Sequence, residues 1–318
     1  MIRKLRCILA LVLSALLLCS SYAAAYAENT YLTLQRKSIT FKGETYYQKR
    51  RVTTVLLLGI DRWNDETGEG GLYRNGGQSD FLLLLAVDDN AKTVSSILFN
   101  RDTMCDITVL NVFGQELPPQ TAQLCLAYSY GDGGAESAAL TKAAVSALLQ
   151  GQEIEHYYAM RLDGIGILND LLGGIEVTLE DDFTMYDPAM TKGKTMRLDG
   201  KQAEIFTRYR YDVGDSSNTS RMQRQRVYGQ EALRVLKEKM QESSRFIANL
   251  FDALESCSVT DMNRGFLINL ANKMDSYEIK DPALIEGSTT IGKRGTVEFY
   301  ADADSLTQAL VDTLYEKG

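Results

Sequence analysis

Hydrophobic and polar positions alternate along the chain in two periods, one typical of strands and one typical of helices. Apolar runs with the length and composition of buried strands lie at 52–59, 81–87, 93–99, 156–160 and 175–179. The turn residues Asp88, Asp89 and Asn90 separate the second run from the third, which predicts a hairpin. Gly173 and Gly174 end a helical stretch between the last two runs, which predicts a strand, helix, strand unit.

Helical periodicity accounts for most of the remaining chain. Helices are predicted over 135–149, over 163–172 with Asp163 as N-cap, after the N-cap Asp199, two or three times within 220–274, and over 305–315. Short strands are expected near 287–300. Strands that include a hairpin and are interspersed with helices favour an α/β fold, with a mixed central β-sheet sandwiched between helices.

The N-terminal residues have the three parts of a secretory signal. Arg3, Lys4 and Arg6 precede an apolar run over 8–18, and Ala-Tyr-Ala at 25–27 follows it. We therefore expect an extracytoplasmic protein that is anchored in the cell membrane or secreted. The predicted divisions are a signal peptide or N-terminal membrane anchor at 1–27, a polar stalk or peripheral segment at 28–50, and a single domain at 51–318.

Charge and rare residues exclude several classes of function. The net charge of −8 argues against nucleic acid as a partner. Past residue 27 the cysteines are Cys105, Cys125 and Cys257, an odd number that does not fit a disulfide scaffold. His156 is the only histidine, which excludes a multi-histidine zinc site and disfavours a Ser-His-Asp triad.

An arginine-rich stretch, RYRYDVGDSSNTSRMQRQR at 208–226, stands out against this acidic background. It holds five arginines and no lysine, and arginine is the residue that binds two phosphate oxygens at once. A helix capped by Thr219 or Ser220 would place Arg221 and Arg224 in its first turn, where the helix dipole disfavours cations unless an anion is bound. The stretch therefore predicts a small anionic ligand; the alternative is a solvated run of charge.

Three further charged residues fall at the ends of predicted strands. Asp61 follows the first strand, Asp80 opens the second, and Arg101 follows the third. Strand ends of this kind line the ligand crevice of α/β proteins, although aspartate is also common in turns. The coincidence of all three favours a functional site.

In these motifs the sequence resembles the LytR-CpsA-Psr family, extracytoplasmic enzymes that attach lipid-carried glycopolymers to the bacterial cell wall. The resemblance covers about 52–315 and rests on LLLGID at 56–61, SDFLLLLAVD at 79–88, NRDT at 100–103, EHYYAMRLDGIGILNDLLGGIEV at 155–177, LDGKQA at 198–203, RYR at 208–210 and SRMQRQR at 220–226. It implies that 51–318 is a catalytic domain, with a long apolar pocket for a polyprenyl tail and an arginine-lined mouth for its pyrophosphate.

The resemblance also implies roles for individual residues. It places Mg²⁺ on Asp61 and Asp80, and catalysis on these two with Arg101 and Arg221. It places pyrophosphate binding on Arg101, Arg208, Arg210, Arg221, Arg224 and Gln225. Three positions depart from the family pattern: Gln78 replaces an arginine, Asn100 a proline and Asn218 an aspartate. Arg74 and Asp215 are nearby candidates to compensate, and Asn218 is itself a candidate site residue.

The implied activity is a phosphotransfer from a polyprenyl-pyrophosphate-linked glycopolymer to peptidoglycan at the membrane surface. Arginines with a metal held by aspartates suit phosphoryl transfer, which requires positioning and charge neutralisation. The alternative is a non-catalytic or regulatory envelope protein that binds the same lipid intermediates, which Asn218 and Gln78 favour. A glycosidase that uses a carboxylate pair is a second rival, but it has no use for the arginines.

Overall fold

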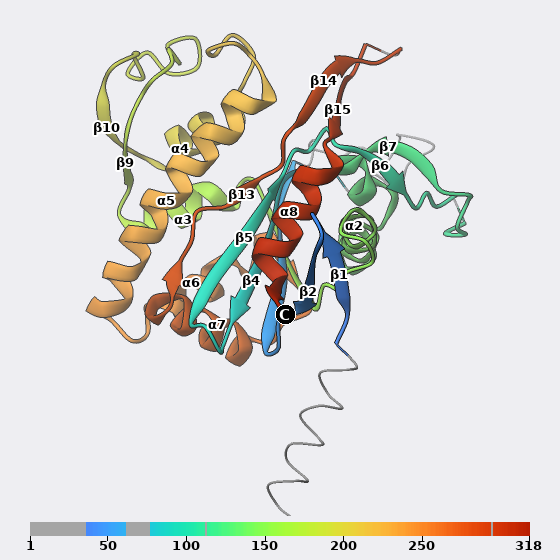
Figure 1. Ribbon diagram of the computed structural model, residues 1–318. Coiled ribbons are helices and arrows are strands. Elements are labelled where there is room, and N and C mark those ends of the chain that lie inside the picture. Colours follow the sequence, from blue (N-terminus) through green and yellow to red (C-terminus); the bar gives the residue numbers. More distant parts are fainter. Residues whose placement is uncertain (1–35, 62–76, 112, 294) are drawn as a thin grey trace, which may run out of the picture. The chain divides into compact units, whose positions relative to one another are not determined.

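The computed structural model describes residues 36–61, 77–111, 113–293 and 295–318, which form two compact units (Figure 1). The signal or anchor predicted at 1–27 lies outside the described residues. The smaller unit contains residues 36–49 and Tyr315–Gly318. Its three antiparallel strands are β1 (Ser38–Phe41), β2 (Glu44–Gln48) and β16 (Tyr315–Lys317), in the order β1-β2-β16. Strands β1 and β2 thus form within the segment predicted as a polar stalk.

The larger unit, Arg50–Leu314, is built on a mixed sheet. Its strands run in the order β11-β8-β3-β4-β5-β12, and β13 also pairs with β5. The strands are β3 (Val52–Asp61), β4 (Gln78–Asp88), β5 (Thr93–Phe99), β8 (His156–Arg161), β11 (Ser258–Thr260), β12 (Glu278–Ile279) and β13 (Ala283–Leu284). Strands β3, β4 and β5 pair antiparallel, whereas β8 runs parallel to β3. The predicted hairpin and the mixed sheet are confirmed.

Continuous apolar sequences place β3 and β4 in the centre of this sheet. Strand β3 reads VTTVLLLGID and pairs on both edges, so it contributes buried side chains to both faces of the sheet. Every residue of β5 is buried. This buried centre positions the strand ends, where Asp61 and Asp80 lie and after which Arg101 follows.

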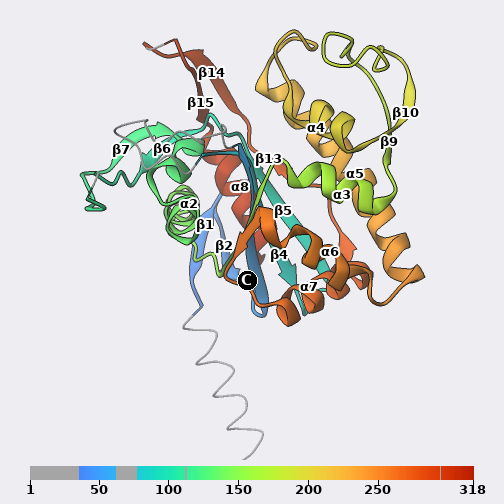
Figure 2. The ribbon, with the colours of Figure 1, turned by 180° about the vertical axis from the view of Figure 1, so that it is seen from behind.

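Helices cover both faces of the sheet, as the sequence predicts. They are α2 (Ala135–Leu148), α3 (Gly164–Leu172), α4 (Gly200–Arg208), α5 (Asn218–Glu242), α6 (Phe246–Leu254), α7 (Arg264–Ser276) and α8 (Ala303–Leu314), with 3₁₀ turns at Leu124–Tyr130 (η1) and Glu255–Cys257 (η2). Figures 1 and 2 show α8 on one face and α6 with α7 on the other. Within the described residues no helix is long and apolar enough to cross a membrane.

Three smaller hairpins lie outside the main sheet. They are β6–β7 (Met104–Ile107 and Gln120–Gln123), β9–β10 (Ile175–Thr178 and Thr195–Leu198) and β14–β15 (Gly287–Ile291 and Val297–Ala301). Strand β9 therefore does not return to the sheet of β8 after helix α3, as the predicted strand, helix, strand unit suggested. Gly173 and Gly174, both at φ 85°, turn the chain, and Asn169 Nδ2 and Oδ1 bond to Leu198 O and Ile175 N, which fixes β9 against β10.

Of the three predicted helix caps, that of α5 is wrong, while Asp163 and Asp199 are confirmed as N-cap residues, Asp199 alone with a capping bond. Helix α5 is capped by Ser217, whose Oγ accepts a bond from Ser220 N at 3.0 Å, and not by Thr219 or Ser220. The extended backbone of Ser217 explains this, because an N-cap residue lies outside the helix. Asp163 makes no capping bond, since its carboxylate pairs with Arg161. Asp199 forms the predicted cap, as part of a capping box with Gln202.

Candidate functional site

Strand direction brings Asp61, Asp80 and Arg101 to one end of the sheet. Strand β3 ends at Asp61, which pairs in register with Gln78 at the start of β4. Strand β5 is antiparallel to β4, so the residues after Phe99 return to the same end. The three strand ends predicted to form a site are therefore adjacent in space.

Asp80 joins two arginines from distant parts of the sequence. One of its carboxylate oxygens pairs with Arg101 Nη1, and the other accepts from Arg221 Nη1 at 2.9 Å. The side chains are almost shielded from water, with 5% of Asp80, 13% of Arg101 and 4% of Arg221 exposed. The buried carboxylate and the two buried guanidinium groups form a preorganised cluster. Each buried charge is stabilised by its partners, so removal of one leaves the others uncompensated.

A chain of amide bonds continues from Arg221. Arg221 Nη2 donates to Asn218 Oδ1 at 2.7 Å, and Asn218 Nδ2 donates to Asn100 Oδ1, also at 2.7 Å. Asn100 and Asn218, two of the three departures from the family pattern, thus contact each other across 118 positions. The third, Gln78, accepts a bond from Arg101 Nη2. Relative to the family pattern, Gln78 removes one positive charge and Asn218 removes one negative charge. The three departures together therefore leave the net charge of the cluster unchanged.

Arg208 and Asp61 form a second ion pair beside this cluster. Arg208 Nη2 lies 2.7 Å from Asp61 Oδ1, and its Nη1 lies 2.8 Å from Glu204 on the preceding turn of α4. Burial raises the pKa of Asp61, and the negative charge of Asp80 adds to the rise, although Arg208 opposes it. A carboxylate held in this way favours a cation or a proton as an additional partner.

Arg210 and Asp102 complete the group of charges. Arg210 makes no ion pair within the described part of the chain; its Nη2 lies 3.5 Å from the hydroxyl of Tyr211. Burial raises the pKa of Asp102, while Arg101, Arg210 and Arg221 act in the opposite direction. Asp102 Oδ2, Arg101 Nε and Arg221 Nε are buried and have no hydrogen-bond partner among the described residues. Buried polar atoms are rarely left in this state, so the cluster has unused capacity for a ligand.

The remaining predicted site residues are placed differently. Arg224 donates to the carbonyl oxygens of Phe206 and Tyr209 and pairs with Asp181, so its guanidinium ties the end of α4 to α5. Gln225 donates to Thr207 O at 3.1 Å. Asp215 is exposed.

Asp215 Oδ1 accepts from Ser217 N, and hydrogen bonds from Ser217 lower its pKa. Arg74 lies outside the described residues. The roles of all these residues in the site stay predictions.

Two contacts at the cluster were not anticipated from the sequence. The Cys125 thiol, on η1, lies 3.0 Å from Arg101 Nη2, and burial raises its pKa to about 11. Gln123 Nε2 bonds to Asp102 Oδ1 at 2.9 Å. Asp102 could have been found, because it directly follows Arg101. Cys125 and Gln123 lie in a stretch without a recognisable motif, so only the fold reveals them.

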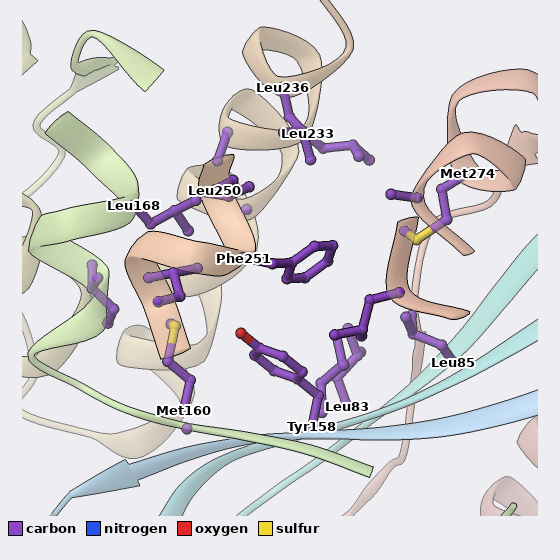
Figure 3. A pocket seen from close by; sticks show the side chains of 18 of the residues that line it. Leu83, Leu85, Tyr158, Met160, Leu168, Leu233, Leu236, Leu250, Phe251 and Met274 are labelled. Atoms are coloured by element: carbon purple, nitrogen blue, oxygen red, sulfur yellow. The ribbon is translucent and has the colours of Figure 1, made fainter. Parts of the chain in front are cut away.

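An apolar pocket of about 440 Å³ lies between the sheet and the helices α3, α5, α6 and α7. Its wall is formed by aliphatic, aromatic and methionine side chains. Figure 3 shows those of Leu83, Leu85, Tyr158, Met160, Leu168, Leu233, Leu236, Leu250, Phe251 and Met274 around the cavity. Gly229 leaves open space on the α5 wall, since a Cβ built there meets nothing within 4 Å. A cavity of this size and lining accommodates a hydrocarbon chain.

One end of the pocket adjoins the charged cluster. Gly59 and Phe81 line the pocket and lie within two positions of Asp61 and Asp80 along their strands. Thr207 and Gln225 contribute the polar groups at this end of the wall. An amphiphile with an apolar tail and an anionic head therefore fits the pocket and the arginines together.

Asp61 and Asp80 fit a magnesium ion only in part. Both oxygens of Asp80 are engaged by arginines, whereas Asp61 shows an ion pair through Oδ1 alone. The described residues contain no group of three or more carboxylate, histidine or cysteine side chains that would hold a metal. Mg²⁺ often uses one or two carboxylates and completes its shell with water and substrate phosphate, so the fit requires a phosphate ligand.

Comparison with known proteins identifies the family. The LytR_cpsA_psr family model matches residues 15–311, nearly the whole chain. The chain belongs to the LytR-CpsA-Psr family. This LytR-CpsA-Psr protein is 32% identical over 199 residues to the polyisoprenyl-teichoic acid–peptidoglycan teichoic acid transferase TagU of Enterococcus faecalis, a match over 63% of this chain and 57% of that one. It is 28% identical over 216 residues to biofilm regulatory protein A of Streptococcus mutans, over 63% and 50% of the two chains.

Solved structures share the fold of this LytR-CpsA-Psr protein. The protein gbs0355 of Streptococcus agalactiae superimposes with a TM-score of 0.65 at 20% identity, over 82% of this chain and 87% of that one. TagV of B. subtilis gives 0.61 at 20% identity, over 83% and 96%. TagT bound to LI-WTA gives 0.62 at 20% identity, over 83% and 91%. The predicted α/β fold is thereby confirmed, and the chain spans about half the length of the curated relatives it matches.

Proposed function

We propose that this protein is an extracytoplasmic phosphotransferase that moves a glycopolymer from a polyprenyl-pyrophosphate carrier to peptidoglycan. The observation that carries the proposal is the apolar pocket that ends at a cluster of arginines and aspartates. The pocket suits a polyprenyl tail, and guanidinium groups suit the pyrophosphate. The name of the Enterococcus faecalis relative, a teichoic acid transferase, supports the same substrate class.

The reaction exchanges one phosphorus–oxygen bond for another. A hydroxyl oxygen of the peptidoglycan acceptor attacks the phosphorus next to the glycopolymer, and the bond between that phosphorus and the bridging oxygen breaks. Polyprenyl phosphate leaves with the bond electrons, and the proton of the hydroxyl passes to a base or to solvent. The products are a glycopolymer phosphodiester and polyprenyl phosphate, so no oxidant or other co-reactant is required.

The residues of the cluster position the substrate and neutralise its charge. Arg210 has no ion-pair partner in the described chain and is the cation most available to an incoming phosphate. Arg221 retains a buried Nε without a hydrogen-bond partner among the described residues, and Arg101 Nε has only the Asp102 carboxylate, at 3.5 Å. Arg208 would exchange between Asp61 and a phosphate oxygen, which frees the carboxylate as the phosphate arrives.

We extend the proposal to Mg²⁺ as cofactor, held by Asp61 with water and phosphate oxygens, and by Asp80 if it releases an arginine. When bound, the ion supplies Lewis-acid polarisation of a phosphoryl oxygen. The raised pKa of Asp61 supports this role, because a buried carboxylate gains most from a cation. We also propose that residues 1–27 direct the protein out of the cytoplasm and leave it at the membrane surface, where its lipid substrate is found.

A regulatory or non-catalytic lipid-binding role is the second candidate. It is favoured by Asn218, which cannot accept a proton in place of an aspartate, and by the name of the Streptococcus mutans relative. Transfer of a glycopolymer from a polyprenyl-pyrophosphate carrier to peptidoglycan by the purified full chain in detergent separates the two. We expect transfer in wild type and loss of at least tenfold in lipid-pyrophosphate affinity for Arg210→Ala, since a charge-assisted bond is worth about 1.5–3 kcal/mol. Tight lipid binding without any transfer would support the second candidate.

A further inference from the structure

An aromatic cluster lies directly beside the arginines and has no part in the proposed chemistry. It consists of Tyr186, Tyr209 and Tyr211, which we call the tyrosine platform. The rings of Tyr186 and Tyr209 lie 4.5 Å apart between centroids, and the hydroxyl of Tyr186 donates to Tyr211 O at 2.7 Å. Tyr186 and Tyr209 pack against the buried apolar cluster formed by β9, β10, α4 and α5, whereas Tyr211 is 68% exposed.

Guanidinium groups of the site stack on this platform. The Cζ atom of Arg208 lies 5.8 Å from the ring centroid of Tyr209, and that of Arg210 lies 5.2 Å from the ring centroid of Tyr211. Tyrosines of the platform and candidate phosphate-binding arginines therefore alternate along one segment. A phosphate bound by these arginines would lie next to the tyrosine rings.

The order of residues in this segment gives the platform a direction. Thr207 lines the apolar pocket, Arg208 pairs with Asp61, and Tyr209 to Tyr211 follow. Four residues of chain span at most about 13 Å, so the segment leads from the pocket, past the charges, to an aromatic surface within the length of a small ligand. A lipid diphosphate with its tail in the pocket would present the group on its other phosphorus to this surface.

The loop that carries the platform is held in a fixed, strained shape. Asp212 and Ser216 both have positive φ, 57° and 59°, which is uncommon for residues other than glycine. The hydrogen bonds from Val213 N to Arg210 O and from Ser216 N to Val213 O close two turns around them. Strain of this kind is concentrated at ligand-binding segments, and the first of these turns begins at Arg210 and includes Tyr211.

We propose that the tyrosine platform binds the first pyranose ring of the donor, the sugar esterified to the diphosphate. This inference rests on the proposed function, since it assigns the sugar end of the same substrate. A pyranose has an apolar face of C–H groups that packs on an aromatic ring and a rim of hydroxyls. Asp212 directly follows Tyr211, and its charge contributes, after burial, to the raised pKa of the Tyr186 phenol. A carboxylate is an acceptor for such hydroxyls.

The test compares two ligands on the full chain in detergent: geranylgeranyl diphosphate, and the same diphosphate esterified with N-acetylglucosamine. We expect wild type to bind the sugar-bearing ligand more tightly. Tyr211→Ala should lose roughly three- to tenfold more affinity for that ligand than for the plain diphosphate, the range of one aromatic contact. Tyr211→Phe should retain wild-type affinity, because the ring is kept. Tyr300→Ala, at a 46% exposed tyrosine of β15, is the matched control and should change neither affinity.

Equal affinity of wild type for the two ligands, or an equal loss for both in Tyr211→Ala, would overturn the sugar assignment and leave the proposed function standing. An effect of Tyr211→Ala confined to the KM of the peptidoglycan acceptor would likewise overturn it, by moving the platform to the acceptor side. If wild type binds neither ligand, the proposed function fails and this inference fails with it.

Discussion

Replacing Asp80 by asparagine would test whether one carboxylate holds the two arginines of the site in place. Asp80→Asn keeps the size of the side chain but removes its charge. Arg101 and Arg221, whose side chains are 13% and 4% exposed, would then face each other without an anion between them. Removing one partner of a buried ion pair costs about 3–5 kcal/mol, and here the missing partner serves two cations. We expect the free energy of unfolding to fall by about 3–5 kcal/mol.

The measurement is urea unfolding followed by far-UV circular dichroism at 25 °C. Asp252→Asn is the matched control, because it removes a carboxylate that pairs with Arg264 at 2.7 Å when both side chains are more than half exposed. That change should cost less than about 1 kcal/mol. Inorganic diphosphate provides a second readout: it should stabilise Asp80→Asn more than wild type, since the freed guanidinium groups bind the anion. A loss below about 1 kcal/mol in Asp80→Asn, with no added effect of diphosphate, would refute the reasoning.

Three further outcomes are expected. A double-mutant cycle of Asn218→Asp and Asn100→Ala should give a coupling energy of about 1–3 kcal/mol, because the Asn218 amide donates to Asn100 Oδ1 and a carboxylate at 218 has no hydrogen to donate. Additive effects would contradict the amide pair. Gly229→Ala should stabilise the protein by roughly 0.5–1 kcal/mol in chemical unfolding, since the added Cβ enters open space on a helix. Gly229→Phe should instead fill part of the pocket and weaken lipid-diphosphate binding. Undiminished binding would place the lipid tail elsewhere. Hydrogen bonds from Lys273 and Tyr277 lower the pKa of Asp89. Its carboxylate therefore stabilises the fold above the ordinary pKa of about 3.9, and this stabilisation is lost as the pH falls through the lowered pKa. Asp89→Asn should reduce the free energy of unfolding at about pH 7 and much less near pH 2, and an equal loss at both would refute this.

The central sheet was predictable from sequence because its signals are local. The continuous apolar runs of β3, β4 and β5, and the turn between the last two, need no information from distant residues. The same holds for the strand ends, since antiparallel pairing alone brings Asp61, Asp80 and Arg101 together.

The details of the site depend on contacts that no local pattern contains. That Arg221 reaches Asp80, whereas Arg224 on the same helix ties down Tyr209 O, follows from how α5 packs and not from its helical spacing. The hydrogen bond between Asn218 and Asn100 likewise depends on the tertiary structure, because neither residue has a sequence pattern that predicts it. The cap at Ser217 was missed because a run of serine, asparagine and threonine offers several acceptable caps.

Helix α5 connects the pocket to the charged cluster as one continuous helix. It carries Asn218 and Arg221 at its start and lines the pocket as far as Met240. The axial distance from Arg221 to Met240 is about 28 Å at 1.5 Å per residue, so a tilt of roughly 5° about one end moves the other by about 2.5 Å. A displacement of that size would break the hydrogen bond between Arg221 and Asp80. A ligand that tilts the far end of α5 would therefore act through the helix as a lever and would shift Arg221 relative to Asp80.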